Sequence, residues 1–183
     1  MTLQMEAISH LGQSDLGDRI VKVNHAGENG AIAIYTGQIL LARVTAPQLV
    51  DELREFRSHE RRHRAIFGAE LARRHRRRCR SYWLCGFGGF ILGLITGLFG
   101  PRAIAATTVA VESVVLRHLE HQLVVLRTRD PAAVAAISEI VSEERQHHDR
   151  SAAHAQTDTF WFKALKPIVA AATESVIWLG MRL

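Results

Sequence analysis

Two sets of glutamate and histidine residues recur along this chain with identical internal spacing, and they limit its fold more than any other feature. In each set a lone glutamate is followed by a Glu-x-x-His motif, and Glu28 precedes Glu60 by the same interval by which Glu112 precedes Glu144. One such motif arises by chance on any charged helix, but two copies with an upstream glutamate at the same distance indicate an internal repeat. The six residues are Glu28, Glu60, His63, Glu112, Glu144 and His147.

The turn signals of the chain lie at the midpoints of the two sets. The residue halfway between the first two glutamates is next to Thr45-Ala46-Pro47, and the corresponding residue of the second set is next to Asp130-Pro131. Antiparallel helices bring residues level when they are equally far from the turn, and i, i+3 spacing puts the Glu and His of each motif on one face. Two such hairpins packed together give four carboxylates and two imidazoles at one height, the ligand set of di-iron and di-manganese four-helix bundles.

The remaining pattern predicts an all-α protein. Proline and glycine are sparse, the segments between them have helical length, and no alternating strand pattern competes. We expect Asp18 to be the N-cap of the first helix, Pro47 to lie in the first turn of the second, and Asp130 with Pro131 to begin a later one. The expected helices cover 18–44, 47–80, 102–128, 131–156 and 160–182, with an apolar stretch at 83–99.

The surroundings of the two lone glutamates favour metal ligands over surface charges. Small residues that permit close helix approach flank Glu28, and Glu112 interrupts the apolar run 108–116. A carboxylate buried in such surroundings is costly unless it is paired or bound to a metal. Any one of the six residues, taken alone, is more often a surface charge than a ligand, so the prediction depends on the whole constellation.

Length and composition fit one intracellular domain. The chain has 183 residues, for which we predict an N-terminal tail at 1–17 and a single domain at 18–183. Its two cysteines, Cys79 and Cys85, are too few for a disulfide scaffold, and the opening residues lack a secretion signal. Much of the net charge of +5 comes from the arginine-rich segment 73–80. This segment is compatible with three roles: binding anionic lipid, binding nucleic-acid phosphates, or forming the solvated end of a helix. Lipid binding is favoured over nucleic-acid binding.

The segment 81–101 contains no charged residue and is nominally long enough to cross a bilayer. A single crossing there would separate the first set of repeated residues from the second, and the six-residue site could not assemble. We therefore predict an apolar helix at the membrane interface, with Arg80 and Trp83 at the level of the headgroups. A buried core helix is the alternative. The expected location is peripheral, on the cytoplasmic side of the cell membrane.

Five motifs resemble the Coq7/Clk-1 family of demethoxyubiquinone hydroxylases, in order from about Ile20 to the C-terminus. They are Asn24-His25-Ala26-Gly27-Glu28, Ile34-Tyr35-Thr36-Gly37-Gln38, His59-Glu60-Arg61-Arg62-His63, Val109-Ala110-Val111-Glu112-Ser113 and Glu143-Glu144-Arg145-Gln146-His147-His148-Asp149. The resemblance implies a membrane-associated ferritin-like fold with two iron ions per chain, held by the six repeated residues. Homologues often carry Glu at the position of Ser113 and Tyr at that of Leu119, and neither departure removes a ligand.

The activity implied by this resemblance is oxygen-dependent hydroxylation of the ring of a demethoxyubiquinone-type quinol in ubiquinone biosynthesis. Carboxylates and imidazoles suit iron, although these ligands alone do not exclude manganese, and they leave positions open for dioxygen. We expect His118 to orient the ligands from just outside the ligand set, ahead of His25 and His148.

The resemblance also implies partners. These are a polyprenyl quinol, dioxygen and a membrane lipid surface, and we expect no nucleic acid. The electron donor is open between NADH and the quinol itself, and the assembly is open between a homo-oligomer and a ubiquinone-biosynthesis complex.

Other functions compete with this hypothesis. A ferritin-like peroxidase or catalase uses similar ligands but has no need of an apolar flank. An iron-binding or storage protein is disfavoured by the basic and apolar surface, and a membrane adaptor does not explain the six-residue constellation.

Overall fold

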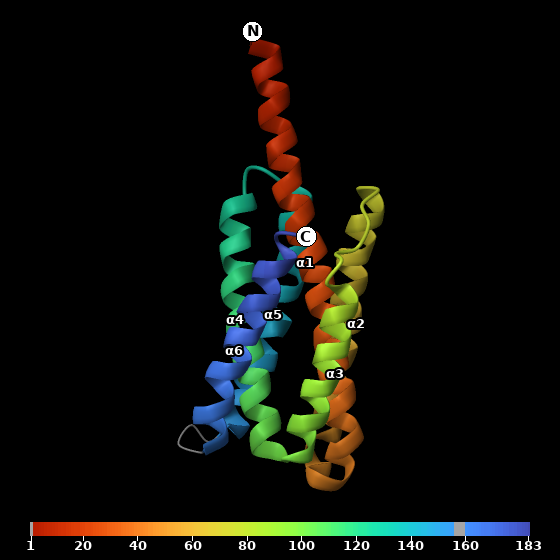
Figure 1. The fold of residues 1–183 in the computed structure, drawn as a ribbon, viewed down its shortest axis with the longest axis vertical. Helices are drawn as coiled ribbons and strands as arrows, with labels where there is room; N and C mark the ends of the chain where they lie inside the picture. The colour runs from red at the N-terminus through yellow and green to blue at the C-terminus, as the bar shows by residue number, and fades with distance from the viewer. Residues whose placement is uncertain (1, 156–159) are drawn as a thin grey trace.

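The fold is a bundle of helices, as the sequence predicts (Figure 1). The structure, a computed structural model, describes residues 2–155 and 160–183, with side chains described in 16–155 and 160–183. All regular elements within these ranges are helical. They are α1 (Thr2–Thr45), the short 3-10 helix η1 (Pro47–Leu49), α2 (Val50–Arg73), α3 (Tyr82–Leu98), α4 (Pro101–Leu126), α5 (Pro131–His154) and α6 (Phe160–Gly180).

The chain runs up and down the long axis of the molecule (Figure 1). α1 and α2 form one antiparallel hairpin, and α4 and α5 form the other. α3 runs back along α1 and joins the two hairpins, while α6 packs along α4. Each repeated set of Glu and His residues therefore lies on one hairpin, which is the arrangement inferred from the midpoints of the repeat.

The predicted turn signals are confirmed. Asp130 is the N-cap of α5, where its side chain accepts a hydrogen bond from the backbone N–H of Ala133 at 3.1 Å, and Pro131 occupies the first turn. Pro47 lies in the first turn of η1. Proline at these positions costs nothing because the first N–H groups of a helix have no partner within the helix.

The predicted start of the first helix is wrong. α1 begins at Thr2, so Asp18 lies inside the helix and is not its N-cap. The Asp18 carboxylate is buried and accepts hydrogen bonds from Arg74 and Arg76, at 3.2 and 2.5 Å, rather than from backbone N–H groups. Arginines far away in the sequence therefore occupy the carboxylate oxygens that an N-cap would have offered to backbone N–H groups.

The second helix also ends earlier than predicted, at Arg73 rather than Arg80. His75 follows with φ of 52°, the left-handed region that a side chain rarely adopts and that a helix cannot contain. Continuing the helix would stack a run of like charges on successive turns, which is unfavourable. The chain instead crosses the end of the bundle and begins α3 at Tyr82.

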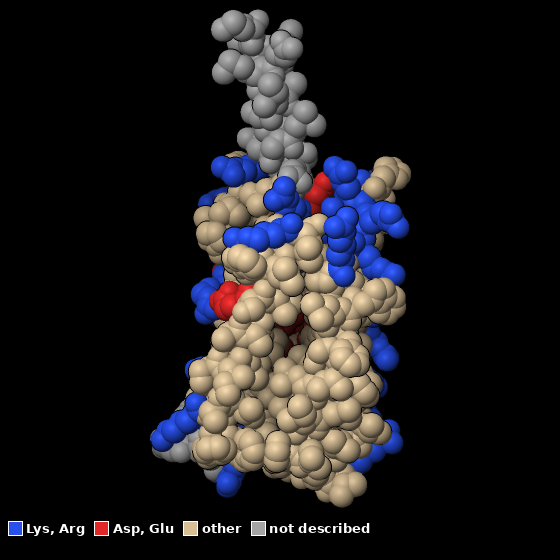
Figure 2. Space-filling view, in the orientation of Figure 1, with Lys and Arg blue, Asp and Glu red and all other residues tan. Residues whose placement is uncertain are grey.

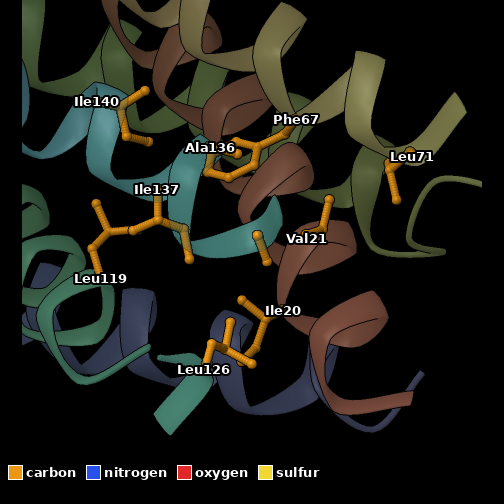
Figure 3. Packing of buried hydrophobic residues seen from close by; sticks show 10 residues of the cluster. Ile20, Val21, Phe67, Leu71, Leu119, Leu126, Ala136, Ile137 and Ile140 are labelled. Carbon is orange, nitrogen blue, oxygen red and sulfur yellow. The ribbon is translucent and has the colours of Figure 1, made fainter. Parts of the chain in front are cut away.

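Two of the hydrophobic clusters in the described part of the chain lie on either side of the six repeated residues along the bundle axis. The first joins α1, α2, α4 and α5 near the α4–α5 turn (Figure 3). It contains Ile20, Val21, Phe67, Leu71, Leu119, Leu126, Ala133, Ala136, Ile137 and Ile140. The second lies near the α1–α2 turn and contains Tyr35, Ile39, Ala42, Ala46, Leu49, Val50, Leu53, Phe56 and Ile104. The six residues are thus held between two apolar layers that exclude water from both ends.

α3 packs against α1 through glycine. A Cβ atom at Gly93 would lie 2.1 Å from the carbonyl oxygen of Ile34, and one at Gly89 would lie 2.4 Å from that of Gly30. No side chain fits at these positions without moving a backbone, so the glycines set the distance between the two helices. Their i, i+4 spacing puts them on one face of α3.

The opposite face of α3 is apolar and exposed. Trp83 and Phe87 are 67% and 71% exposed, and Leu98 is 60% exposed. The alternative of a buried core helix at this segment is therefore wrong: α3 is a surface helix with one glycine face on the bundle. In the described part of the chain, no helix combines the length and apolarity required to span a membrane.

Candidate metal centre

The structure brings all six repeated residues together inside the bundle. Glu28 comes from α1, Glu60 and His63 from α2, Glu112 from α4, and Glu144 and His147 from α5, and every one of them is buried. Their ligand atoms form two groups in which all atoms lie within 4.8 Å of one another. One group is Glu28, Glu60, His63 and Glu144, and the other is Glu60, Glu112, Glu144 and His147.

The two groups interlock across the hairpins. His63 Nδ1 lies 2.8 Å from Glu144 Oε1 on the other hairpin and 3.7 Å from Glu60 Oε2 on its own. His147 Nδ1 lies 3.1 Å from Glu60 Oε1 on the other hairpin and 3.6 Å from Glu144 Oε2 on its own. Glu60 and Glu144 thus face both imidazoles and belong to both groups.

The donor atoms fit a metal better than they fit each other. Glu60 Oε1, His63 Nδ1, Glu144 Oε1 and His147 Nδ1 are all buried and make no hydrogen bond of acceptable geometry, although they lie close together. Buried polar atoms without a partner are rare and costly in native proteins. Here four such atoms converge, and their lone pairs are of the kind that a divalent cation binds.

The charges of the site point the same way. Burial, and then the neighbouring carboxylates, raise the pKa of both Glu28 and Glu112 well above the ordinary value. Burial by itself would raise the pKa of Glu60 and lower the pKa values of His63 and His147, but the contacts between the carboxylates and the imidazoles outweigh it. The pKa of Glu60 is therefore lowered, and the pKa values of His63 and His147 are raised to about 10 and about 9. Without a metal, protons on these groups would offset the repulsion among the four carboxylates, and a metal would replace those protons.

Tyr35 is a neighbour of the site to which the sequence analysis gave no role. Its hydroxyl donates a hydrogen bond to Glu112 Oε1 at 3.2 Å, and its ring packs edge-on against the rings of Phe56 and His147. Tyr35 lies two helical turns after Glu28 on the same face of α1, and that spacing could have identified it. Its counterpart in the second half of the repeat is Leu119, so this phenol belongs to one hairpin only.

Two further side chains reach the outer nitrogens of the histidines. His63 Nε2 lies 2.8 Å from Glu143 Oε2, and His147 Nε2 lies 3.0 Å from His59 Nδ1. The sequence analysis quoted both residues within motifs but gave neither a role. The available signal was again the repeat, because His59 and Glu143 occupy equivalent positions in its two halves, each directly before a shared glutamate.

His118, His25 and His148, the three histidines expected around the ligands, have different surroundings in the structure. His118 lines a cavity next to the six residues, and its Nε2 lies 2.7 Å from Glu174 Oε2 on α6. His25 stacks on Tyr82 with ring centroids 5.1 Å apart, away from the carboxylates, and His148 pairs with Asp149 at the surface. Glu174 as the partner of His118 could not have been identified from local sequence.

The cavity leads from the surface to the candidate metal centre. Its volume is about 330 Å³, and its walls come from α1, α3, α4 and α6. Most lining side chains are apolar, whereas Glu28, Glu60, Glu112 and Glu144 line its inner end. Figure 2 shows the opening as a hollow in an uncharged face, with acidic atoms visible in its depth. A mostly apolar pocket with a few convergent polar groups is typical of a small-molecule site.

Comparison with known proteins agrees with this geometry. Residues 15–180 match the family described as "Ubiquinone biosynthesis protein COQ7". The chain is 31% identical over 170 residues to the NADPH-dependent 3-demethoxyubiquinone 3-hydroxylase of Mus musculus, and 32% identical over 166 residues to the 3-demethoxyubiquinol 3-hydroxylase of Rhodospirillum rubrum. Each alignment covers 90% of this chain and 77% of the relative. The resemblance drawn from the five motifs is thereby confirmed, and the chain belongs to the COQ7 family.

Proposed function

We propose that this protein is an oxygen-dependent hydroxylase that acts on the ring of a demethoxyubiquinone-type quinol in ubiquinone biosynthesis. The two relatives are named as hydroxylases of 3-demethoxyubiquinone and 3-demethoxyubiquinol, and each alignment covers 77% of the relative. The observation that carries the proposal is the pair of buried Glu and His groups at the inner end of an apolar cavity. A peroxidase or an iron-storage protein would have the same ligands but no use for such a cavity.

We further propose that the two groups hold two iron ions per chain. Glu28 and His63 would serve one ion, Glu112 and His147 the other, and Glu60 and Glu144 both. Bound iron would supply the activation of dioxygen that a ring hydroxylation requires. The carboxylate set and the four buried atoms without hydrogen bonds support this assignment.

The protein itself would position the quinol and keep water away. The apolar lining formed by Ile34, Leu92 and Val115 suits the ring and the first part of a polyprenyl tail. His118 at the wall is the polar group that we assign to a ring oxygen. The contact of its Nε2 with Glu174 Oε2 at 2.7 Å fixes the ring. In the neutral tautomer with the proton on Nε2, Nδ1 is the atom that would accept a hydrogen bond from a quinol hydroxyl.

We infer that the protein attaches peripherally to the cytoplasmic side of the cell membrane. α3 borders the cavity and exposes apolar side chains, and the face around the cavity is largely uncharged (Figure 2). Basic side chains gather at the end of the molecule where α3 begins (Figure 2). Arg78 stacks on both Tyr82 and Trp83, which suits a headgroup-level anchor. A quinol with a polyprenyl tail could then enter the cavity without leaving the lipid.

The topology has its own test. With Cys introduced in place of Arg76 and of Arg102, on either side of α3, a membrane-impermeant thiol reagent should label both from the same side. Labelling from opposite sides would contradict the peripheral attachment.

The electron donor and the assembly stay predictions. The mouse relative is named as NADPH-dependent, so a nicotinamide donor is the first to test, with the quinol as the alternative. A homo-oligomer and a ubiquinone-biosynthesis complex are both open.

The substrate is tested by quinone analysis. Deleting the gene should make the demethoxy precursor accumulate, as measured by mass spectrometry, and labelled dioxygen should place label on the ring in the intact strain. A strain that keeps normal ubiquinone after deletion, with no second hydroxylase present, would favour a peroxidase or an iron-binding protein instead.

A further inference from the structure

The two histidines of the candidate centre have different partners at equivalent positions. His63 Nε2 contacts the carboxylate of Glu143, whereas His147 Nε2 contacts the imidazole of His59. Both partners directly precede the shared glutamates, and both lie at the same position of the repeat. The two halves therefore place a side chain at the same position, but it is a carboxylate in one half and an imidazole in the other.

This difference acts on the nitrogen that faces the metal. For Nδ1 to bind a cation, the proton of each imidazole must be on Nε2. His63 would then donate its Nε2–H to a carboxylate, and His147 would donate its own to a neutral imidazole. A carboxylate partner makes a ligating histidine a stronger donor, because its negative charge favours electron density on the ring.

The partners are also held differently. Glu143 is fixed from its outer side by an ion pair with Arg62. His59 stacks on His147, with ring centroids 5.3 Å apart and planes 12° apart. Each contact orients its histidine, but only His63 has a carboxylate in hydrogen-bond contact with its outer nitrogen. The same Glu143 oxygen lies 4.0 Å from His59 Nδ1, so it acts on His147 only at longer range, past the ring of His59.

We propose that Glu143 makes the cation position of Glu28 and His63 the tighter of the two, and that the position of Glu112 and His147 is weaker because His59 takes the place of a carboxylate. Glu143 and His59 are positioning residues, since they act through the histidines. The inference rests on the proposed two-metal site. It adds that the two halves of that site are unequal.

Each position has to be measured separately, because two cations that share Glu60 and Glu144 repel each other. Glu112→Ala removes a ligand that belongs only to the His147 position, and Glu28→Ala removes one that belongs only to the His63 position. Mn²⁺ binding to each metal-free full-length variant would be followed by calorimetry. We expect Glu112→Ala, which keeps the His63 position, to bind Mn²⁺ more tightly than Glu28→Ala.

The second substitution tests the cause. Glu143→Gln keeps the shape of the side chain but removes its charge. It should weaken Mn²⁺ binding about 10–100-fold in the Glu112→Ala protein, the usual effect of losing an outer partner. The effect in the Glu28→Ala protein should be clearly smaller, because there Glu143 reaches the ligating histidine only through His59. Glu139→Gln, which removes an exposed carboxylate one turn earlier on α5, is the matched control and should change neither.

His59→Glu gives an independent test that does not depend on losing a contact. In the Glu28→Ala protein it should tighten Mn²⁺ binding, because it puts a carboxylate where the other half already has one. Melting temperatures of the metal-free variants would show that folding is unchanged.

The outcomes separate this inference from the proposal beneath it. Equal Mn²⁺ affinities in the two single variants, or equal weakening of both by Glu143→Gln, would overturn the inference while leaving the metal centre in place. If the unaltered chain binds no Mn²⁺ or iron at all, the metal centre and the inference fall together.

Discussion

Two groups of buried carboxylates in this bundle differ in how their negative charge is balanced. At one end Arg74 contacts Asp18, Glu70 and Asp130, with two hydrogen bonds to Asp130 at 2.6 and 2.8 Å. In the middle the six repeated residues put four carboxylates together without an arginine or lysine among them. The first group, here called the Arg74 cluster, contains its own positive charge. The second requires protons or metal ions.

The pKa values of the carboxyl groups record this difference. Burial raises the pKa of Asp130, but hydrogen bonds from Arg74 and the backbone of Ala133 outweigh it, and the pKa lies below the ordinary value. Burial and the neighbouring carboxylates raise the pKa of Glu28 and Glu112. A buried carboxylate cluster is therefore better evidence for a metal site when no guanidinium of the same chain neutralises it.

The largest effect is expected from the glutamates that both proposed metal positions share. Glu60→Ala or Glu144→Ala should lower bound iron from two per chain toward none and abolish turnover, because each substitution removes a ligand from both groups. Elemental analysis of purified protein measures the iron. Arg74→Met is the comparison variant and should leave iron content unchanged, whereas full iron in both glutamate variants would contradict the assignment.

The next largest effect should come from opening the Arg74 cluster. Arg74→Met leaves the mostly buried carboxylate of Asp130 without its cation, whereas Asp18 keeps its ion pair with Arg76. Removing one partner of a buried pair costs up to about 3–5 kcal/mol. Urea unfolding of the metal-free protein measures this loss. A change below about 1 kcal/mol would show that the cluster is screened by water like a surface pair.

The two clusters should also respond to pH with opposite signs. The folded pKa of Asp130 is lowered, so its contribution to stability is lost as the pH falls through that pKa. The folded pKa values of His63 and His147 are raised to about 10 and about 9, so their contribution is lost as the pH rises through those values.

A metal should replace the protons of the second cluster, so its stabilising effect should grow with pH. The increase in melting temperature on adding Mn²⁺ would be compared at about pH 6 and about pH 8, on either side of the ordinary pKa of histidine. An increase that is larger at the lower pH would contradict the picture of protons held in place of cations.

The smallest effect is expected at an ion pair that faces water. Arg145 and Glu120 join α5 and α4 at the surface, and both side chains are more than half exposed. Glu120→Ala should change the free energy of unfolding by less than about 1 kcal/mol, since exposed pairs contribute little. The same urea measurement as for Arg74→Met gives the value, and a loss as large as that of Arg74→Met would remove the distinction between buried and exposed pairs.

The sequence alone determined the all-α class and the six residues of the candidate site. Both follow from distances along one helix or across one turn, which the regular rise of the α-helix fixes whatever the helix packs against. The same local rule placed Asp130 and Pro131 at the start of α5, where a side chain and a missing N–H act on their own turn.

The tertiary structure decided which residues from different helices meet. Asp18 has the chemistry of an N-cap, but Arg74 from another helix contacts it inside α1. Glu143 and His59 looked like ordinary polar residues until the two hairpins brought each one to a histidine of the other. Such contacts depend on the rotation and separation of packed helices, which the glycines of α3 and the apolar clusters set jointly and no local pattern records.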